Sequence, residues 1–251
     1  MIEQLVLGII QGITEWLPVS SEGLLVLTQT HLFGQKDLSD FISQALFLHL
    51  GTFLAALVYF RKEILKLSKN KKLARFLIIT TLISGAVGFL FLQLIKGIES
   101  QVEITGKAAT LLVGLLLLIT GGLQLKSKNQ GKKTQKQLTT ADGVVLGFVQ
   151  GLAALPGLSR SGSTVAILLL LGFSKTESLK LSFLMSLPIV FLGNLVLNFS
   201  YLSAPAFWWG LLASFIFGLL TIRLLLKLAQ KINFGKFVIF FGALTIISVL
   251  I

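Results

Sequence analysis

The pattern of long apolar runs and two interrupted ones constrains this chain more than any other feature. Six runs reach about the 20 apolar residues that a helix needs to cross a bilayer. Two more segments, 2–32 and 141–172, are each broken near the middle by a proline and polar residues, and each half is too short to cross. Because a broken helix at membrane depth needs partners for its open backbone, each predicts a re-entrant helical hairpin. The six expected spans are 40–60, 74–95, 108–126, 178–199, 206–228 and 234–251.

Composition supports an all-α integral membrane protein. The 251 residues are 54% hydrophobic and only 13% charged, whereas a soluble domain carries roughly a quarter charged residues. The chain has no cysteine, which excludes disulfides, thiolate nucleophiles and cysteine-ligated metals, and its two histidines leave little scope for a histidine-rich metal centre. Met1 leads directly into an apolar stretch without the features of a cleavable signal.

The two interrupted segments resemble each other. LGIIQGITEWLPVSSEG, residues 7–23, aligns with LGFVQGLAALPGLSRSG, residues 146–162, and only the proline is displaced. A shared order of Gln-Gly, proline, serine and glycine predicts an internal duplication. Repeat one covers 1–126, a cytoplasmic linker covers 127–140, and repeat two covers 141–251. Each repeat has one hairpin and three spans, so the second copy enters the membrane upside down, which gives an inverted-topology repeat.

The cations of the loops predict the orientation. In this topology 18 of the 22 Lys and Arg residues fall on one side, which is therefore cytoplasmic, and both termini are extracytoplasmic. The net charge of +12 is thus explained by topology, and no nucleic-acid partner is expected. The 18 are Arg61, Lys62, Lys66, Lys69, Lys71, Lys72, Arg75, Lys126, Lys128, Lys132, Lys133, Lys136, Lys175, Lys180, Arg223, Lys227, Lys231 and Lys236. Lys36, Lys96 and Lys107 fall on the other side.

Polar side chains gather at the first hairpin tip. Glu15 lies in an apolar run, where an ionised carboxylate is costly unless it is paired or binds a cation. Gln11 lies one turn earlier on the same helix face. Ser20 and Ser21 are suited to cap the next half-helix, whose first turn holds Glu22. We expect Glu15 to be functional, while a purely structural ion pair for Glu15, a structural Gln11 and simple capping by Ser20 and Glu22 remain alternatives.

The second tip predicts a phosphate site. Arg160 lies among Ser159, Ser161, Gly162 and Thr164 at the expected start of a half-helix. Free N–H groups of a helix start, hydroxyl donors and a guanidinium together suit phosphate oxygens. If the two tips meet near the midplane, they enclose one anionic group, and a phosphate or diphosphate is the expected ligand. The alternative is that Arg160 serves only as the partner of Glu15.

The two tip motifs, EWLPVSSEG and PGLSRSGST, resemble those of the undecaprenyl pyrophosphate phosphatase family of the bacitracin-resistance type. The similarity extends over nearly the whole chain, including the runs 47–62 and 181–194. It implies hydrolysis of undecaprenyl diphosphate to the monophosphate and phosphate at the outer face of the plasma membrane, assisted by Mg or Ca ions. Carried over by position, Glu15 is implied to be a metal ligand or base, Ser21 the hydroxyl near the attacked phosphorus, and Arg160 the diphosphate clamp.

Two positions differ from the family pattern. Gln11 stands where the family has a glutamate, and Leu24 stands where it has a histidine. We hypothesise that His49, inside an expected span, supplies the missing imidazole and that Glu22 supplies the missing carboxylate as a second metal ligand. A buried histidine that bridges helices is the alternative for His49, and we expect His31 to be structural.

The residues thus favour a polyprenyl diphosphate phosphatase in which Arg160 and the helix starts stabilise the phosphoryl oxygens. Ser21, or a water activated by Glu15 or His49, is expected to attack. Gln11, Ser20, Ser159, Ser161, Gly162 and Thr164 are expected to bind the substrate. The alternatives are a non-hydrolytic carrier of a polyprenyl phosphate or another anion, favoured by the inverted repeat, and a protein that only sequesters the lipid. The expected partners are the bilayer and the lipid, with a homodimer left open.

Overall fold

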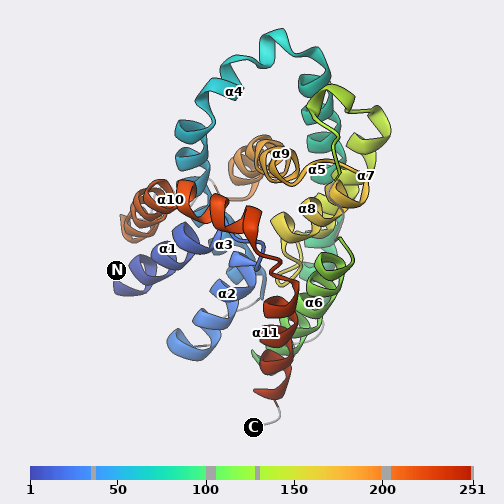
Figure 1. Cartoon of the computed structure of the whole chain (residues 1–251). Coiled ribbons are helices and arrows are strands. Elements are labelled where there is room, and N and C mark those ends of the chain that lie inside the picture. The colour runs from blue at the N-terminus through green and yellow to red at the C-terminus, as the bar shows by residue number, and fades with distance from the viewer. Residues whose placement is uncertain (35–37, 100–105, 128–130, 199–204, 250–251) are drawn as a thin grey trace.

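The computed structural model describes residues 1–34, 38–99, 106–127, 131–198 and 205–249, and all extended elements within them are helices (Figure 1). The all-α prediction is confirmed for these residues. The expected loop cations Lys36 and Lys128 lie outside them. The α-helices are α1 (Ile2–Thr14), α2 (Ser21–Thr28), α3 (Leu38–Tyr59), α4 (Arg61–Leu65), α5 (Lys71–Glu99), α6 (Gly106–Lys126), α7 (Thr140–Leu152), α8 (Arg160–Leu170), α9 (Lys175–Leu197), α10 (Pro205–Lys231) and α11 (Gly235–Ile247). Short turns of other helix types are η1 (Gln29–Phe33), η2 (Leu67–Lys69) and η3 (Gln135–Gln137).

Five helices of the described residues are long and apolar enough to cross a membrane, namely α3, α5, α6, α9 and α10. Helices α5 and α10 carry many exposed apolar side chains, as expected of surfaces in contact with lipid. The sixth expected span, 234–251, contains α11, whose 13 residues extend only about 20 Å. Residues 250–251 and residue 199, at the ends of two expected spans, lie outside the described part. The chain is a multi-pass membrane protein.

The two interrupted segments are broken where the sequence predicts. Helix α1 ends at Thr14 and α2 begins at Ser21, while α7 ends at Leu152 and α8 begins at Arg160. The first helices of the two segments also bury equivalent faces. Leu7, Gly8, Gln11 and Gly12 are buried on α1, and their counterparts Leu146, Gly147, Gln150 and Gly151 are buried on α7.

The helices of the two halves pack on one another reciprocally. Helix α1 packs along α10, α7 packs along α5, α6 packs along α11, and α3 packs against α9 (Figure 1). Small residues allow the close crossings. A Cβ atom on Gly12 would lie 2.8 Å from both the amide nitrogen of Gly218 and the carbonyl oxygen of Ser214 on α10. The end of α1, where Glu15 lies, is therefore fixed by backbone-to-backbone packing.

Trp16 anchors the first tip to the core. Its side chain is 1% exposed, and its indole N–H donates to the carbonyl of Gly218 on α10 at 3.1 Å. Its ring centroid lies 5.5 Å from that of Phe183 on α9. Because the adjacent residue is Glu15, this anchor fixes the position from which the carboxylate reaches the centre of the molecule.

Candidate functional site

The first tip turns sharply between α1 and α2. Glu15 ends α1, and residues 15–20, including Pro18, form no regular helix. Ser20 adopts the left-handed conformation at φ 65° and caps α2 by accepting the amide of Gly23 at 3.2 Å. The capping expected of Ser20 is confirmed, and its hydroxyl is already engaged. Ser21, the first residue of α2, turns its hydroxyl back toward Glu15.

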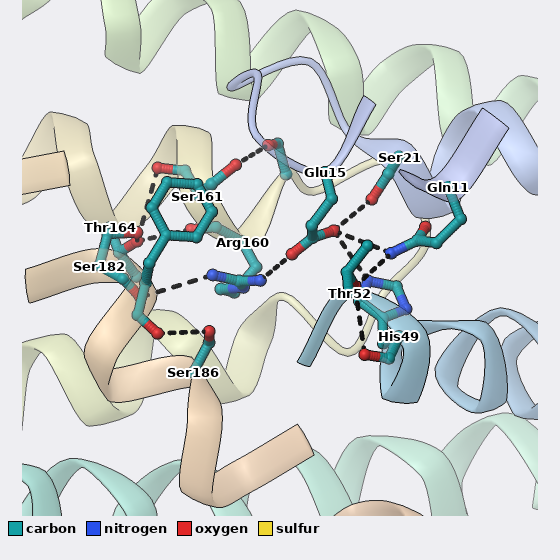
Figure 2. Close-up of polar contacts among 12 residues, drawn as sticks. Gln11, Glu15, Ser21, His49, Thr52, Arg160, Ser161, Thr164, Ser182 and Ser186 are labelled. Carbon is teal, nitrogen blue, oxygen red and sulfur yellow. Dashed lines mark hydrogen bonds and ion pairs between the residues drawn. The ribbon is translucent and has the colours of Figure 1, made fainter. Parts of the chain in front are cut away.

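Three side chains point at one oxygen of the Glu15 carboxylate (Figure 2). Its Oε2 accepts from Gln11 Nε2 at 3.0 Å and from Ser21 Oγ at 2.8 Å, and it lies 3.2 Å from His49 Nε2. Glu15 is only 6% exposed. The expected common face of Gln11 and Glu15 is therefore confirmed, and the structure adds Ser21 and His49 to the same carboxylate.

The contacts of His49 determine where its protons lie. Its Nδ1 is 2.6 Å from the carbonyl oxygen of Ala45, and a carbonyl only accepts, so Nδ1 carries a proton. Its Nε2 faces a carboxylate oxygen, which also accepts when ionised, so a second proton lies between the two groups. With Glu15 ionised, His49 is an imidazolium that donates to Glu15 and to its own helix α3.

The second tip places Arg160 at the start of α8. Gly157 has φ 101°, a conformation that glycine adopts without the steric cost of a side chain, and Ser159 caps the helix by accepting the amide of Gly162 at 3.0 Å. Helix starts leave their first amides without intrahelical partners. The amide of Gly162 is committed to the cap, and the amides of Arg160 and Ser161 are the first-turn groups that an anion at this helix start would reach.

Arg160 joins the two tips. Its Nη2 forms an ion pair with Glu15 Oε1, and its Nη1 donates to the carbonyl of Ser182 on α9 at 3.4 Å. The guanidinium also lies over the ring of Phe183, 5.6 Å from the centroid. Ser161 adds a second link by donating to the carbonyl of Leu17 at 3.3 Å. The tips meet, and the pairing of Glu15 with Arg160 weighed from the sequence is present.

Two cavities share Glu15, His49 and Arg160 in their walls. One is polar and lies at the tips, where its other lining residues are Ser20, Ser21, Glu22, Leu158, Ser159 and Ser161. The other, called the apolar cavity after the side chains that distinguish it from the first, lies mainly against α3 and α9. Besides the three shared charged residues it is lined by Trp16, Phe53, Ala56, Phe183 and Val190 and by the hydroxyl residues Thr52 and Ser186. The ion pair thus stands between a polar chamber and an aromatic-lined one, an arrangement that suits a ligand with a polar head and an apolar tail.

The structure separates the predicted binding residues into two groups. Ser20, Ser159 and Ser161 line the polar cavity. Thr164 does not line either cavity, because its hydroxyl bonds the carbonyl of Arg160 and the hydroxyl of Ser182, each at 2.7 Å. Thr164 therefore supports the backbone behind Arg160.

Three residues that contact the site were not predicted. Thr52 accepts from Gln11 at 3.4 Å, and Ser182 and Phe183 contact Arg160. Thr52 lies three residues after His49 on α3, so the helical period provided a signal for it. Nothing local in the sequence marked Ser182 or Phe183.

The donor groups of the described residues do not fit a metal ion held by the protein alone. Glu15 and Glu22, the expected ligands, both line the polar cavity, but Glu15 is already bonded on both oxygens and His49 donates both of its N–H groups. No group of three acidic, histidine or cysteine side chains that could hold an ion is found in the described part of the chain. Mg or Ca ions prefer six or more oxygen ligands.

The chain is similar to known proteins over nearly its whole length. The chain matches the model of the family described as "Bacitracin resistance protein BacA" over residues 4–247. A protein of Methanococcoides burtonii named undecaprenyl-diphosphatase is 38% identical, with 98% of this chain and 97% of that protein covered. Proteins with the same name from Methanothrix thermoacetophila and Methanopyrus kandleri are 39% and 34% identical, with 98% and 96% of this chain covered and 95% and 93% of the relatives. The chain belongs to the bacitracin resistance protein BacA family.

Proposed function

We propose that this protein is an undecaprenyl-diphosphatase of the plasma membrane, which hydrolyses the lipid diphosphate to the monophosphate and inorganic phosphate. The observation that carries the proposal is the convergence of Arg160 and the Ser21 hydroxyl on one buried carboxylate, that of Glu15, where the two tips meet. The names of the relatives favour this reaction over carriage or sequestration of the lipid.

The two cavities suit the two ends of such a substrate. The diphosphate occupies the polar cavity, where Ser159, Ser161 and the first amides of α8 surround Arg160. The prenyl tail begins in the apolar cavity, beside Phe53 and Phe183. Arg160 faces both cavities, so it turns from Glu15 to the phosphoryl oxygens when the diphosphate enters. This exchange of one anion for another keeps the guanidinium paired throughout.

The chemical step uses Ser21 and Glu15. The Ser21 hydroxyl donates to Glu15 Oε2 at 2.8 Å, a distance suited to proton transfer. Its oxygen attacks the terminal phosphorus as Glu15 takes the proton, the bridging P–O bond breaks, and the lipid monophosphate leaves with the electron pair. Water then hydrolyses the phosphoserine and releases phosphate. A water molecule at the position of the hydroxyl would give the same products in one step.

Gln11 and His49 orient the base. Both donate to the same oxygen as Ser21, and Gln11 is held in turn by Thr52. The positive charge of His49 stabilises the Glu15 carboxylate, which would otherwise be costly in this buried position. His49 in this way compensates for the missing histidine of the family motif by supporting the base, while the proton of Ser21 passes to Glu15.

No step of this mechanism passes through a metal ion. Arg160, the start of α8 and the imidazolium of His49 supply the positive charge that phosphoryl transfer requires. Since the described part of the chain has no group of three acidic, histidine or cysteine side chains that could hold an ion, a divalent ion that assisted the reaction would need further ligands from the substrate. Glu22, in the wall of the polar cavity, is then its available carboxylate.

The topology is an inverted repeat of 1–126 and 141–251, with each interrupted segment re-entrant and α11 the sixth span. Reciprocal packing supports it: α1 of the first half packs on α10 of the second, and α7 of the second packs on α5 of the first. Corresponding helices α3 with α9 and α6 with α11 pack on each other, as a two-fold axis between the repeats requires.

The 18 cations expected on one side fall in four basic segments, 61–75, 126–136, 175–180 and 223–236. In this topology these segments are cytoplasmic and both termini are extracytoplasmic. Contacts link these segments in series. Lys72 donates to the carbonyl of Lys136 at 3.1 Å, Lys133 lies over the ring of Phe173, and Lys175 donates to the carbonyl of Ile232 at 3.2 Å. Segments that touch in this way share one end of the molecule, and the excess of cations at that end supports a cytoplasmic location for it.

Phosphate release from undecaprenyl diphosphate by the purified protein tests the proposal. We expect release that Glu15→Gln and Ser21→Ala each reduce strongly, and phosphate trapped on Ser21 in acid-quenched samples identifies it as the nucleophile. Residual release in Ser21→Ala without a trapped phosphate assigns the attack to water. Lipid binding without any release in the wild type, with and without Mg, would reject the phosphatase and favour the carrier.

A further inference from the structure

One face of α6 contacts both hairpin tips. Thr120 and Gln124 lie one helical turn apart on this face and are 0% and 6% exposed. Both are polar residues inside an apolar span, so their side chains need hydrogen-bond partners at membrane depth. Each finds its partner on a different hairpin.

Gln124 holds the first tip. Its side-chain Nε2 donates to the carbonyl oxygen of Pro18 at 2.6 Å. The backbone carbonyl of Gln124 accepts from Asn233 Nδ2 at 3.4 Å. The side chain of Gln124 also lies directly against the second tip, because a Cβ atom on Gly162 would be 2.6 Å from Gln124 Nε2. The amide of Gln124 is therefore enclosed between the two tips and bonded to one of them.

Thr120 holds the second tip. Its hydroxyl accepts from the amide of Ser159 at 3.2 Å and donates to the carbonyl of Gly157 at 3.5 Å. Ser159 is the cap of α8 and immediately precedes Arg160. On the first tip, Pro18 lies three residues after Glu15. The two bonds of α6 are thus made within three residues of the two charged groups of the site.

We infer that Thr120 and Gln124 are positioning residues that keep the two tips at a fixed spacing while the ion pair between them is open. The inference rests on the proposed function, in which the diphosphate takes Arg160 from Glu15. Once that pair opens, the direct side-chain link left between the tips is the bond from Ser161 to the carbonyl of Leu17. The α6 face then keeps the Glu15 carboxylate on the first tip and the Arg160 guanidinium on the second at a constant distance from each other.

Kinetics of Thr120 variants test this role. Thr120→Val keeps the shape and removes the hydroxyl, and we expect kcat to fall about tenfold or more, because small displacements of catalytic groups are costly. KM should stay within about twofold, since the tail still binds. Thr120→Ser should retain most of the activity. Thr245→Val is the matched control, because Thr245 is 6% exposed and its hydroxyl donates to the carbonyl of Phe241 within its own helix α11. Equal kcat in Thr120→Val and Thr245→Val, at equal thermal stability, would overturn the inference.

Hydrogen exchange of the two tips separates this inference from the proposed function. Gln124→Met removes the bond to Pro18, and we expect faster exchange in peptides from both tips, including the second tip to which Gln124 is not bonded. Thr120→Val should likewise speed exchange at the first tip. Faster exchange confined to the directly bonded tip in both variants would refute a shared support. A wild-type protein that releases no phosphate would reject the phosphatase, and the exchange data would still decide the role of α6.

Discussion

The carboxylate of Glu15 and the guanidinium of Arg160, 145 residues apart in the chain, form an ion pair where the two hairpin tips meet. Both groups are largely buried, and both line the polar and the apolar cavity. The carboxylate and the guanidinium therefore neutralise each other at the centre of the molecule. In the proposed mechanism, an anionic substrate opens this ion pair by replacing Glu15 on Arg160.

Substitution of Arg160 tests whether it binds phosphate or only neutralises Glu15. We expect Arg160→Ala to lower kcat by about 10³-fold, as for arginines that stabilise phosphoryl transfer. Arg160→Lys keeps the charge but loses the planar pair of donors, so it should restore only part of the rate. Steady-state phosphate release measures both. If Arg160 were only a structural partner of Glu15, the double variant Arg160→Ala with Glu15→Gln would be no worse than Glu15→Gln alone, with lipid affinity unchanged.

His49 can be tested as a donor to Glu15 rather than as a source of protons. His49→Gln places an amide donor where Nε2 donates to the carboxylate but removes the positive charge, so we expect it to retain part of the activity. His49→Leu leaves the carboxylate without that donor and should lower kcat by about tenfold or more, the typical value of a hydrogen bond to a charged group. Phosphate release measured from pH 5 to 9 checks this. A glutamine variant as inactive as the leucine variant would show that the imidazole proton itself is used.

The close crossing of α1 and α10 predicts a large effect from one methyl group. In Gly12→Ala the new Cβ meets backbone atoms of α10 at 2.8 Å, so α1 must shift, and Glu15 moves with it. Overpacking of this kind costs about 1–3 kcal/mol. We expect a lower unfolding temperature in detergent and a lower kcat. Gly122→Ala on α6 is the matched control, because outside its own stretch of helix no described atom lies within 4 Å of its Cβ position. A Gly12 variant as stable and active as the Gly122 variant would contradict this packing.

Local features of the site could be read from the sequence. The breaks at 15–20 and 153–159 follow from prolines, glycines and polar residues in apolar runs, and the shared face of Gln11 and Glu15 follows from helical spacing. The pairing of Glu15 with Arg160 could be offered as one option, because a buried carboxylate needs a cation and few cations lie away from the loops.

Features that depend on distant segments could not be read in the same way. The direction of Thr164 is set by Ser182 on α9, and the roles of Thr120 and Gln124 are set by tips that precede or follow them by many residues. The expected span 234–251 was longer than α11, because an apolar run does not mark where its helix stops. Hydropathy predicts which segments are buried in the membrane or the core. The hydrogen-bond partners of their polar side chains depend on how the two halves of the chain pack.

Gln11 tests whether an amide beside Glu15 replaces a carboxylate that would need a bound cation. Its Nε2 donates to Glu15 at 3.0 Å, so Gln11→Glu would replace that donor by a second carboxylate at the same position. Two carboxylates so close cannot both ionise unless a cation lies between them. We therefore expect Gln11→Glu to release phosphate slowly without divalent ions and faster as Mg or Ca is added, whereas the wild type responds less. Gln150→Glu is the control, because Gln150 holds the equivalent place in the second half but bonds Ser84 and the carbonyl of Met185, with no carboxylate beside it. The idea would be contradicted if Mg or Ca sped up phosphate release in the Gln150 variant, or failed to do so in the Gln11 variant. Either result would show that the Gln11 amide does not remove a need for a cation beside Glu15.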